Sequence, residues 1–426
     1  MTDVLDDLAA RGLIAQSTDE AALRRALAAG PLVYYCGFDP TAPSLHAGNL
    51  LQFMVLRALQ RAGHQPIVLI GGATGLVGDP NPSSERVLNT PDTVAEWVGR
   101  IRAQVGPFLE EPATRQPGLR SPIYVNNLDW TATLSTIDFL RDIGQHFRVG
   151  RMLSKEAVSA RLNSPLGINY TEFSYQVLQG MDFLELYRRH GCCLQTGGSD
   201  QWGNLTAGVD LIHRVIGVSA HALATPLVTK ADGHKFGKTE SGTIWLDPAM
   251  TSPYVFYQFW LNADDADIQA WLPMFSEHSR EEIAALLDSM KTHPGQREAQ
   301  RSLARELTTL VHGEPASQQA EFAGQALFGR GVELSDLWPG PLEASLQEAG
   351  LTDLDGPTPS MAALLHMCGL ADSLSSARRT VREGGAYLNN QRITDAEAVP
   401  ADQDWIHGRF LVLRRGKRQV AGIRRG

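Results

Sequence analysis

The sequence predicts an α/β fold with a doubly wound parallel sheet, and three observations support it. The run LVYYCGF is aromatic and β-branched, which is typical of a strand. A helix from about Asn49 to Ala62 follows and is ended by Gly63. PIVLIGGAT is then a continuous apolar run closed by glycines, as in a strand buried on both faces. Strand, helix and strand at this spacing form a βαβ unit, which makes the strands parallel.

The remaining elements extend this pattern and divide the chain. Further strands are expected at IYVNN, GCCLQTGG and HALATPLVT, with helices at TLSTIDFLRDIGQHF, TEFSYQVLQGMDFLELYRRH and WGNLTAGVDLIHRVIG between them. Residues 1–29 have the pattern of an acidic amphipathic helix. After about Asp247 the periodicity is helical, and Pro and Gly later mark a linker. We therefore predict a Rossmann-like domain with the N-terminal helix at 1–246, a helical subdomain at 247–338, a linker at 339–359 and a small module at 360–426.

Composition and length restrict the class of protein. The 426 residues correspond to about three domains, and no segment approaches the roughly 18 consecutive apolar residues of a membrane span. The N-terminus MTDVLDDLAARGLIAQ is acidic where a signal peptide would be basic, so a cytoplasmic protein without a membrane partner is expected. The four cysteines show no metal-ligand spacing, so reduced thiols are expected instead of disulfides or zinc.

Charge is distributed unevenly along the chain. The net charge is −9, but the segment from Leu374 to Gly426 has 11 Lys and Arg against 5 Asp and Glu. A basic tail on an acidic body indicates that the tail is the part that meets a polyanion.

The loop after the first predicted strand brings polar groups to a helix amino end. In open α/β sheets, ligands bind outside the carboxyl ends of the strands, and a helix amino end favours phosphate. Gly37 allows close backbone approach there, and Thr41 and His46 add polar side chains. The alternative is that His46 and Asn49 only cap the helix, since Asn is a common N-cap, and spacing alone favours that role.

Two glycine-rich stretches come close to nucleotide-binding motifs without matching them. GGATGLVGDP has Ala73 at the middle glycine of G-x-G-x-x-G, and Asp79 at its rim is either a surface carboxylate or a functional one. GHKFGKT is one residue short of a P-loop, because Asp232 occupies the place of the first glycine. It is either a solvated basic loop or a mobile loop whose Lys235 and Lys238 place two cations on a polyphosphate.

Two further stretches carry polar side chains in places that are usually apolar or structural. YTEFSYQVLQGMDF puts Tyr175, Gln179 and Asp182 on one helical stripe, which either faces water or lines a cavity. QTGGSDQWGN joins a strand to a helix and combines close-approach glycines with Asp200 and Gln201.

Taken in order, these stretches resemble one family along nearly the whole chain. YYCGFDPTAPSLHAGN, GGATGLVGDP, the Tyr175 stripe, LQTGGSDQWGN, PLVTKADGHKFGKTESGTIWLD and the basic tail are similar in order and spacing to the bacterial tyrosyl-tRNA synthetases. The pair SDQWGN and KFGKT is highly specific. The resemblance makes residues 44–49 the H-I-G-H signature of class I synthetases and residues 235–239 the K-M-S-K-S signature.

The resemblance implies a tyrosine–tRNA ligase. Such an enzyme activates L-tyrosine with ATP to give tyrosyl-adenylate, and then transfers the tyrosyl group to the 3′-terminal ribose of tRNA(Tyr). The ionised carboxylate attacks the α-phosphorus directly, so catalysis rests on alignment and charge stabilisation without a general base. Mg²⁺ with ATP as substrate is expected from general phosphate chemistry, without a prosthetic group, and no dedicated protein ligand for the metal is visible in the sequence. The resemblance also implies a homodimer whose tRNA spans both subunits.

Residue roles follow from the same resemblance. Catalysis would use Thr41, His46, Asn49, Lys235 and Lys238. Tyrosine would be bound at its phenol hydroxyl by Tyr35 and Asp182, at its ammonium by Asp79, Tyr175 and Gln179, and nearby by Gln201. ATP would be bound by Gly37, Asp39, His46, Asn49, Gly198, Asp200, Lys235 and Lys238. Buried groups that pair with a hydroxyl reject phenylalanine, a selectivity for which this family is the standard example and which the resemblance supplies.

The tail module is similar to an S4 RNA-binding domain. Arg378, Arg379 and Arg382 fall on one helical face, and GGAYLNNQ has the character of a hairpin. Phosphate contacts from these arginines would position tRNA without reading its sequence. The alternative for this helix is a solvated basic surface.

The chain departs from the family pattern at several positions. Asn49 occupies the fourth H-I-G-H position, Phe236 the second K-M-S-K-S position, and Gly237 replaces its serine. NPSSER lacks the lysines that some members carry before the arginine matched by Arg86.

Three other functions remain possible from the sequence: a nucleotidyltransferase of another class, a noncatalytic RNA-binding protein, and a tryptophanyl-tRNA synthetase. The polar stripe and the basic tail speak against the first, and the two lysines speak against the second.

Overall fold

The computed structural model describes residues 3–81, 85–110, 119–165, 167–231, 233, 236–239, 242–327, 329, 331–416 and 419–426. The chain divides into two units. The first consists of residues 1–247 with 265–287, and the second of residues 248–264 with 288–426.

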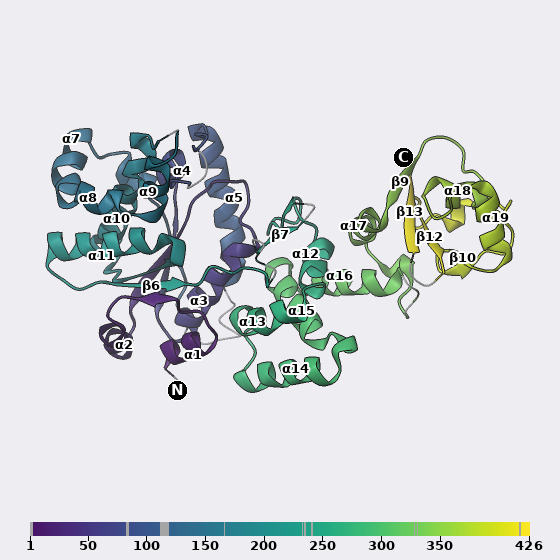
Figure 1. The fold of residues 1–426 in the computed structure, drawn as a ribbon, viewed down its shortest axis with the longest axis horizontal. Coiled ribbons are helices and arrows are strands. Elements are labelled where there is room, and N and C mark those ends of the chain that lie inside the picture. Colours follow the sequence, from purple (N-terminus) through teal and green to yellow (C-terminus); the bar gives the residue numbers. More distant parts are fainter. Residues whose placement is uncertain are drawn as a thin grey trace. The chain divides into compact units, whose positions relative to one another are not determined.

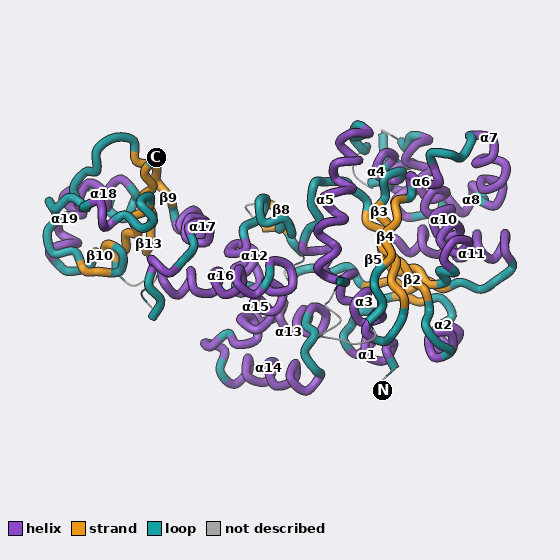
Figure 2. Tube along the Cα trace, turned by 180° about the vertical axis from the view of Figure 1, so that it is seen from behind, coloured by secondary structure: helices purple, strands orange, loops and turns teal. Residues whose placement is uncertain are grey.

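The first unit is organised around a six-stranded sheet in the order β1-β6-β5-β2-β3-β4 (Figures 1 and 2). Strands β2 to β6 are parallel, and only the two-residue β1 runs antiparallel, at the edge beside β6. The predicted doubly wound parallel sheet is confirmed. The order of the strands reverses between β2 and β5, which is where such sheets bind ligands. The strands are β1 Gln16–Ser17, β2 Val33–Phe38, β3 Gln65–Ile70, β4 Ile123–Asn126, β5 Leu194–Gly198 and β6 His221–Thr225.

Helices cover the sheet of the first unit and begin and end where local chemistry allows. In α10, the Asn169 side chain accepts from the Glu172 amide at the start, and Gly191 ends the helix with a φ of 65°. No described helix has the length and apolar character needed to cross a membrane. The helices are α1 Val4–Ala10, α2 Glu20–Ala28, α3 Leu50–Arg61, α4 Thr74–Val77, α5 Pro91–Leu109, α6 Leu128–Thr131, α7 Thr136–Asp138, α8 Val149–Leu153, α9 Glu156–Leu162, α10 Tyr170–His190, α11 Trp202–Ile216, α13 Asp265–Phe275 and α14 Arg280–Thr292, whose end lies in the second unit.

The second unit combines helices with a five-stranded sheet in the order β11-β10-β12-β13-β9. Asn389 and Asn390 have positive φ values between β10 and β11, which confirms the predicted hairpin in GGAYLNNQ. The helices are α12 Pro253–Leu261, α15 Glu298–His312, α16 Glu314–Ala326, α17 Pro339–Ala349, α18 Met361–Met367 and α19 Leu374–Arg382. The strands are β9 Leu351–Leu354, β10 Ala386–Leu388, β11 Gln391–Arg392, β12 Phe410–Arg415 and β13 Gln419–Arg425.

Two sequence expectations about organisation were wrong. The N-terminal segment forms two helices and the edge strand β1, because Gly12 turns the chain with a φ of 75° and β1 finds backbone partners on β6. The segment 339–359, predicted as a linker, contains α17 and β9, and β9 pairs in parallel with β13. Proline at the first turn of α17 and Gly350 after it are helix boundary signals, and they were mistaken for a linker.

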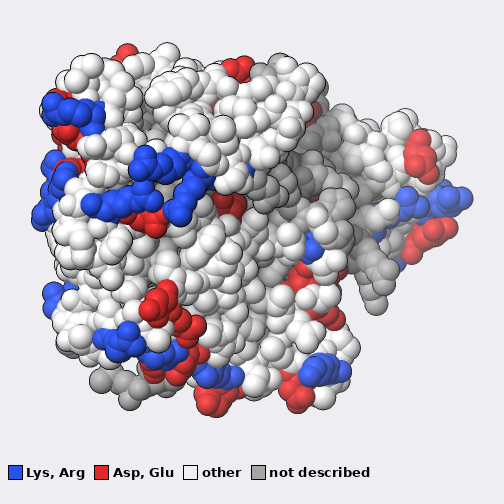
Figure 3. Space-filling view, turned by 60° about the vertical axis from the view of Figure 1, so that its left-hand side comes forward, with Lys and Arg blue, Asp and Glu red and all other residues white. Residues whose placement is uncertain are grey.

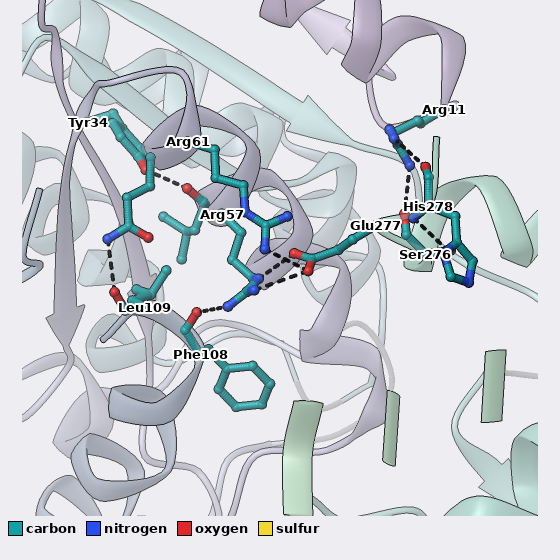
Figure 4. Close-up of polar contacts among 11 residues, drawn as sticks. Arg11, Tyr34, Arg57, Arg61, Phe108, Leu109, Ser276, Glu277 and His278 are labelled. Atoms are coloured by element: carbon teal, nitrogen blue, oxygen red, sulfur yellow. Dashed lines mark hydrogen bonds and ion pairs between the residues drawn. The ribbon is translucent and has the colours of Figure 1, made fainter. Parts of the chain in front are cut away.

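A buried arginine joins α3 to the segment after α13 (Figure 4). Arg57 is 5% exposed and donates from Nε to Oε1 of Glu277 at 2.5 Å and from Nη2 to Oε2 at 3.1 Å. Its Nη1 donates to the carbonyl of Phe108, and Arg61 donates to the same carboxylate at 2.7 Å. Burial raises the pKa of Glu277, but the bonds and charges of the two arginines outweigh it and hold that pKa below its usual value. The ion pair therefore fixes α3 against the end of α13.

Candidate active site

A cavity of about 470 Å³ opens at the carboxyl ends of β2 and β5, within the first unit. It lies at the reversal of strand order, where a doubly wound sheet is expected to bind its ligand. The structure brings most of the predicted site residues to its wall. These are Tyr35, Gly37, Asp39, Thr41, His46, Asn49, Asp79, Tyr175, Gln179, Asp182, Gly198, Asp200 and Gln201.

His46 and Asn49 cap the helix and also line the cavity. The Nδ1 atom of His46 accepts from the Gly48 amide at 3.0 Å, and the His46 amide donates to Oδ1 of Asn49 at 3.0 Å. This reciprocal pair begins the short 3-10 turn Ala47–Asn49 that leads into α3. The capping alternative is therefore correct as a description of local structure. It does not exclude function, because capping holds both side chains at the cavity wall.

Tyr35 and Asp182 form one buried part of the wall. Both are at most 2% exposed, and the Tyr35 hydroxyl has no hydrogen-bond partner among the described residues. Asn127 Nδ2 and Trp130 Nε1 each donate to one oxygen of Asp182, both at 2.9 Å. Burial raises the pKa of Asp182 to about 7, against the effect of these two donors. The same burial, with Asp182 nearby, raises the pKa of Tyr35 well above its usual value.

Asp39 is held by side chains of the cavity wall. Its Oδ1 accepts from the Thr74 hydroxyl at 2.6 Å and its Oδ2 from the Tyr175 hydroxyl at 2.7 Å. Burial raises the pKa of Asp39 to about 6, and the neighbouring Asp79 adds to that effect. The resemblance placed Asp39 with ATP and Tyr175 with tyrosine, whereas the structure joins the two in one hydrogen bond.

Asp79 is the centre of a second polar group. Gln201 Nε2 donates to its Oδ2 at 3.0 Å, and Asn204 Nδ2 donates to its Oδ1 at 3.3 Å. Burial raises the pKa of Asp79, opposed chiefly by the bond from Gln201 and by the charge of Lys155. The side chain is thus a partly exposed carboxylate of the cavity wall that two amide donors hold in place.

The loop expected to carry the lysines is described only in part. Lys235 lies outside the described residues, and Lys238 is described through its backbone alone, in the short strand β7 (Lys238–Thr239) that pairs with β8 (Gly242–Thr243). Gly237 has a φ of 74°, and a Cβ there would lie 3.6 Å from the Gly48 amide nitrogen. The loop therefore passes directly beside the H-I-G-H-like turn.

Phe236 anchors this loop at its unusual second position. Its ring centroid lies 4.8 Å from that of Trp271 and 5.3 Å from that of Phe275, both on α13. Phe236 also lines the cavity. An aromatic side chain in place of methionine thus fits a pocket built from aromatic rings.

Sequence reasoning missed several residues that shape the cavity. Asn127 follows β4, so the rule that ligands meet strand ends could have found it in the quoted run IYVNN. Asn204 ends the quoted motif SDQWGN, but the sequence assigned it no role. Trp130 gave no usable signal, because its role depends on which side chains the fold brings near it. The cavity wall also includes Cys36, Gln52, Thr74, Arg86, Gln195 and Thr196.

Arg86 lies at the rim next to residues 82–84, which are outside the described part of the chain. Its Nε donates to the Asp79 carbonyl at 2.8 Å, and its amide donates to Glu172 at 2.6 Å. Glu172 in turn pairs with Arg161 at 3.0 Å, and both side chains are almost completely buried. Arg86 therefore has a defined position, although NPSSER lacks the lysines that some family members carry.

The three tail arginines lie exposed on α19, whose buried side consists of Ala377, Thr380 and Val381. Of the three, Arg378 pairs with the exposed Glu397 at 2.7 Å. The positive charge that α19 presents is thus partly balanced at Arg378.

Comparison with known proteins agrees with this geometry. The model of the tRNA synthetases class I (W and Y) matches residues 27–329, and that of the tyrosine–tRNA ligase SYY-like C-terminal domain matches residues 342–421. The tyrosine–tRNA ligase of Streptomyces avermitilis is 59% identical over 99% of both chains, and that of Acidothermus cellulolyticus is 58% identical over the whole of both. A C-terminally truncated mitochondrial tyrosyl-tRNA synthetase of Aspergillus nidulans superposes with a TM-score of 0.70 at 29% identity, covering 77% of this chain and 95% of its own.

The cavity lies at the strand reversal and is bordered by a capped His-x-Gly-Asn turn and by Phe236. Together with the family match over residues 27–329, it defines a class I aminoacyl-tRNA synthetase. With full-length identities near 60%, the chain belongs to the bacterial tyrosine–tRNA ligases within the tryptophan and tyrosine group of that class. This membership favours tyrosine over the tryptophanyl alternative.

Proposed function

We propose that the cavity carries out both steps of tyrosine–tRNA ligation, with the phenol ring of the substrate entering beside Tyr35 and Asp182. The supporting observation is the buried Tyr35 hydroxyl, which has no hydrogen-bond partner among the described residues and lies in the same cavity as Asp182. A substrate hydroxyl would satisfy both groups. Phenylalanine would leave the Tyr35 hydroxyl unpaired, which costs about 1–3 kcal/mol for a buried group.

The ammonium group of tyrosine would bind among Asp79, Tyr175 and Gln179, with Gln201 nearby. The Tyr175 hydroxyl donates its proton to Asp39, so its oxygen lone pairs can accept from the ammonium. The Oε1 atom of Gln179 is buried and has no partner within the described residues, which makes it another acceptor. These acceptors and the Asp79 carboxylate match a group that only donates.

The ATP phosphates would lie against the amino end of α3 and the lysine loop. His46 accepts a bond at Nδ1, so its neutral ring carries the proton at Nε2 and can donate it to phosphate. With Asn49 and Thr41 it would align the α-phosphorus for attack by the tyrosine carboxylate, while Lys235 and Lys238 would balance the charge on departing pyrophosphate.

The remaining ATP contacts would come from four residues at the ends of β2 and β5. Gly37, Asp39, Gly198 and Asp200 lie on the cavity wall, where they would border the adenosine portion. The tyrosyl group of the adenylate would then pass to the 3′-terminal ribose of tRNA(Tyr), with release of AMP.

Mg²⁺ is expected to enter with ATP. The described residues include no group of three or more His, Cys, Asp or Glu side chains that could hold a metal ion. We propose that Mg²⁺ is held chiefly by the nucleotide phosphates.

The C-terminal module is proposed to be an S4-type tRNA-binding domain. The exposed arginines of α19 would contact phosphates. Figure 3 shows Lys and Arg on the drawn face in separate groups, several of which have Asp or Glu beside them.

A homodimer in the cytoplasm is the proposed state. Exposed large apolar side chains gather between residues 128 and 170, on helices α6 to α10, as expected of an interface. Four free cysteines agree with a reducing compartment. The exposed apolar side chains on α6 to α10 are Leu128, Ile137, Leu140, Val149, Leu153, Leu162 and Tyr170.

Sedimentation of the wild type and of an Ile137→Asp variant tests the proposed dimer. The wild type should sediment as a dimer and the variant as a monomer, and a monomeric wild type would contradict the proposal.

Amino-acid-dependent ATP–pyrophosphate exchange tests the proposed function. Tyrosine should support exchange, and Tyr35→Phe should raise the KM for tyrosine about tenfold while reducing the preference over phenylalanine. Tyr34→Phe is the matched control, because Tyr34 is equally buried but donates at 2.5 Å to the Leu56 carbonyl, outside the cavity. Exchange that does not require tyrosine, or equal selectivity in both variants, would contradict the proposal.

A further inference from the structure

A lysine behind the cavity wall is linked to the proposed ammonium site through two amide side chains. Lys155 precedes α9 and lines a separate cavity of about 310 Å³, not the one that would hold the substrates. Its Nζ donates to Oδ1 of Asn204. Asn204 in turn bonds to both Gln201 and Asp79.

The ammonium group of Lys155 determines which atom donates and which accepts in each of these hydrogen bonds. A lysine ammonium has donors and no acceptor, so the oxygen of Asn204 must face it and the Nδ2 atom must face away. Nδ2 then donates to Oε1 of Gln201 at 2.7 Å and to Oδ1 of Asp79 at 3.3 Å. With its oxygen occupied, Gln201 presents Nε2 to Oδ2 of Asp79 at 3.0 Å. Each carboxylate oxygen of Asp79 thereby receives an amide donor.

The sequence also provides room for this lysine. A Cβ placed at Gly203 would lie 2.9 Å from Cε of Lys155, closer than real Cβ contacts. The Gly203 carbonyl accepts from Nε2 of Gln176 at 3.1 Å, which fixes the backbone at that point. The glycine in SDQWGN therefore allows the aliphatic stem of Lys155 to reach Asn204.

The position of Lys155 disfavours the charged form of its side chain. Burial lowers the pKa of Lys155 to about 8, and the charge of Asp79 acts in the other direction. The neighbouring Arg151 is different, because it is exposed and pairs with the exposed Asp210 at 2.8 Å.

We propose that Lys155 is a positioning residue for amino-acid activation: it orients Asn204 and Gln201 so that Asp79 is held toward the ammonium of the substrate. The inference rests on the proposed ammonium site at Asp79. Lys155 does not touch the substrate and acts only through the two amides. It should therefore affect recognition of tyrosine and not the handling of ATP.

The test is ATP–pyrophosphate exchange with the full-length protein. Lys155→Met should raise the KM for tyrosine about tenfold, with less than about a twofold change in kcat and in the KM for ATP. In an Asn204→Ala background the same change should have little further effect, because the lysine acts through that amide. Arg151→Met removes a nearby positive charge without touching Asn204, and it should leave the KM for tyrosine unchanged.

A second variant keeps the test decisive if Lys155→Met folds poorly. Gly203→Ala displaces only the far end of Lys155, so it should raise the KM for tyrosine with little change in melting temperature. An unchanged KM in Lys155→Met or Gly203→Ala, or fully additive effects with Asn204→Ala, would overturn the inference. Asp79→Asn distinguishes failure of the Lys155 inference from failure of the ammonium site on which it rests. If Asp79→Asn leaves the KM for tyrosine unchanged, the proposed ammonium site itself is wrong.

Discussion

At the scale of single residues, the cavity brings together three carboxyl groups with raised pKa values. Asp39, Asp79 and Asp182 all lie in its wall, and burial raises the pKa of each. Each is bonded by neutral donors from Thr, Tyr, Asn, Gln or Trp side chains. Such sites favour a ligand that brings its own hydrogen-bond donors, as a phenol and an ammonium do.

The raised pKa of Asp182 predicts how stability depends on pH. A carboxyl group whose folded-state pKa is raised from 3.8 to about 7 stabilises the fold fully below pH 4, and this contribution is lost as the pH rises toward 7. The free energy of unfolding of the ligand-free protein should fall by about 2–4 kcal/mol between pH 4.5 and 7.5. Urea unfolding at several pH values measures it.

Two variants test whether Asp182 causes this pH dependence of stability. Asp182→Asn should reduce the pH dependence, although Asp39 keeps part of it because its pKa is also raised, to about 6. Asp142→Asn, at an exposed carboxylate outside the cavity wall, should leave the dependence nearly unchanged. The same slope in Asp182→Asn as in the wild type would contradict the assignment.

At the scale of elements, the two segments that resemble the class I signatures are attached to two helices, α3 and α13, that an ion pair holds together. The H-I-G-H-like turn begins α3, and Phe236 of the lysine loop packs on α13. The Arg57–Glu277 pair joins the far end of α3 to the residue just after α13 (Figure 4). The position of the loop base relative to the turn therefore depends on this buried ion pair.

Removing one partner of that pair should be costly. Glu277→Gln removes the charge of the carboxylate that Arg57 and Arg61 share, and should lower the free energy of unfolding by about 2–4 kcal/mol. Asp210→Asn breaks an exposed pair and should change it by less than about 1 kcal/mol. Chemical denaturation of both variants measures these changes in the free energy of unfolding. Similar changes in the two variants would show that the Arg57–Glu277 pair does not stabilise the contact between α3 and the segment after α13.

At the scale of the whole molecule, the chain combines an acidic body with a basic C-terminal segment. From Leu374 onward Lys and Arg outnumber Asp and Glu by 11 to 5, whereas the net charge of the chain is −9. Because adenylate formation needs no RNA, the two halves of the reaction should respond differently to changes in this segment.

Charge removal on α19 should separate those halves. The triple variant Arg378→Gln, Arg379→Gln, Arg382→Gln should keep ATP–pyrophosphate exchange and lose about tenfold or more in tRNA charging efficiency at physiological salt. The loss should shrink at higher salt, because phosphate contacts are screened in both proteins. Equal charging by variant and wild type across the salt series would exclude a role for this helix in tRNA binding.

The sequence determined the elements and the chemistry available to them. Apolar runs, caps and glycine ends set β2, α3, β3 and α10, because these signals act over a few residues and do not need the rest of the chain. The order of the motifs along nearly the whole chain was enough to indicate the family.

The tertiary structure decided which side chains meet and which segments pair. The bonds from Asn127 and Trp130 to Asp182, and from Lys155 to Asn204, join residues about 50 positions apart, and no local pattern encodes them. The strands β1 and β9 gain their backbone partners only from β6 and β13. Hydrogen bonds and burial of this kind depend on distance in space, and that distance is fixed only when the whole chain has packed.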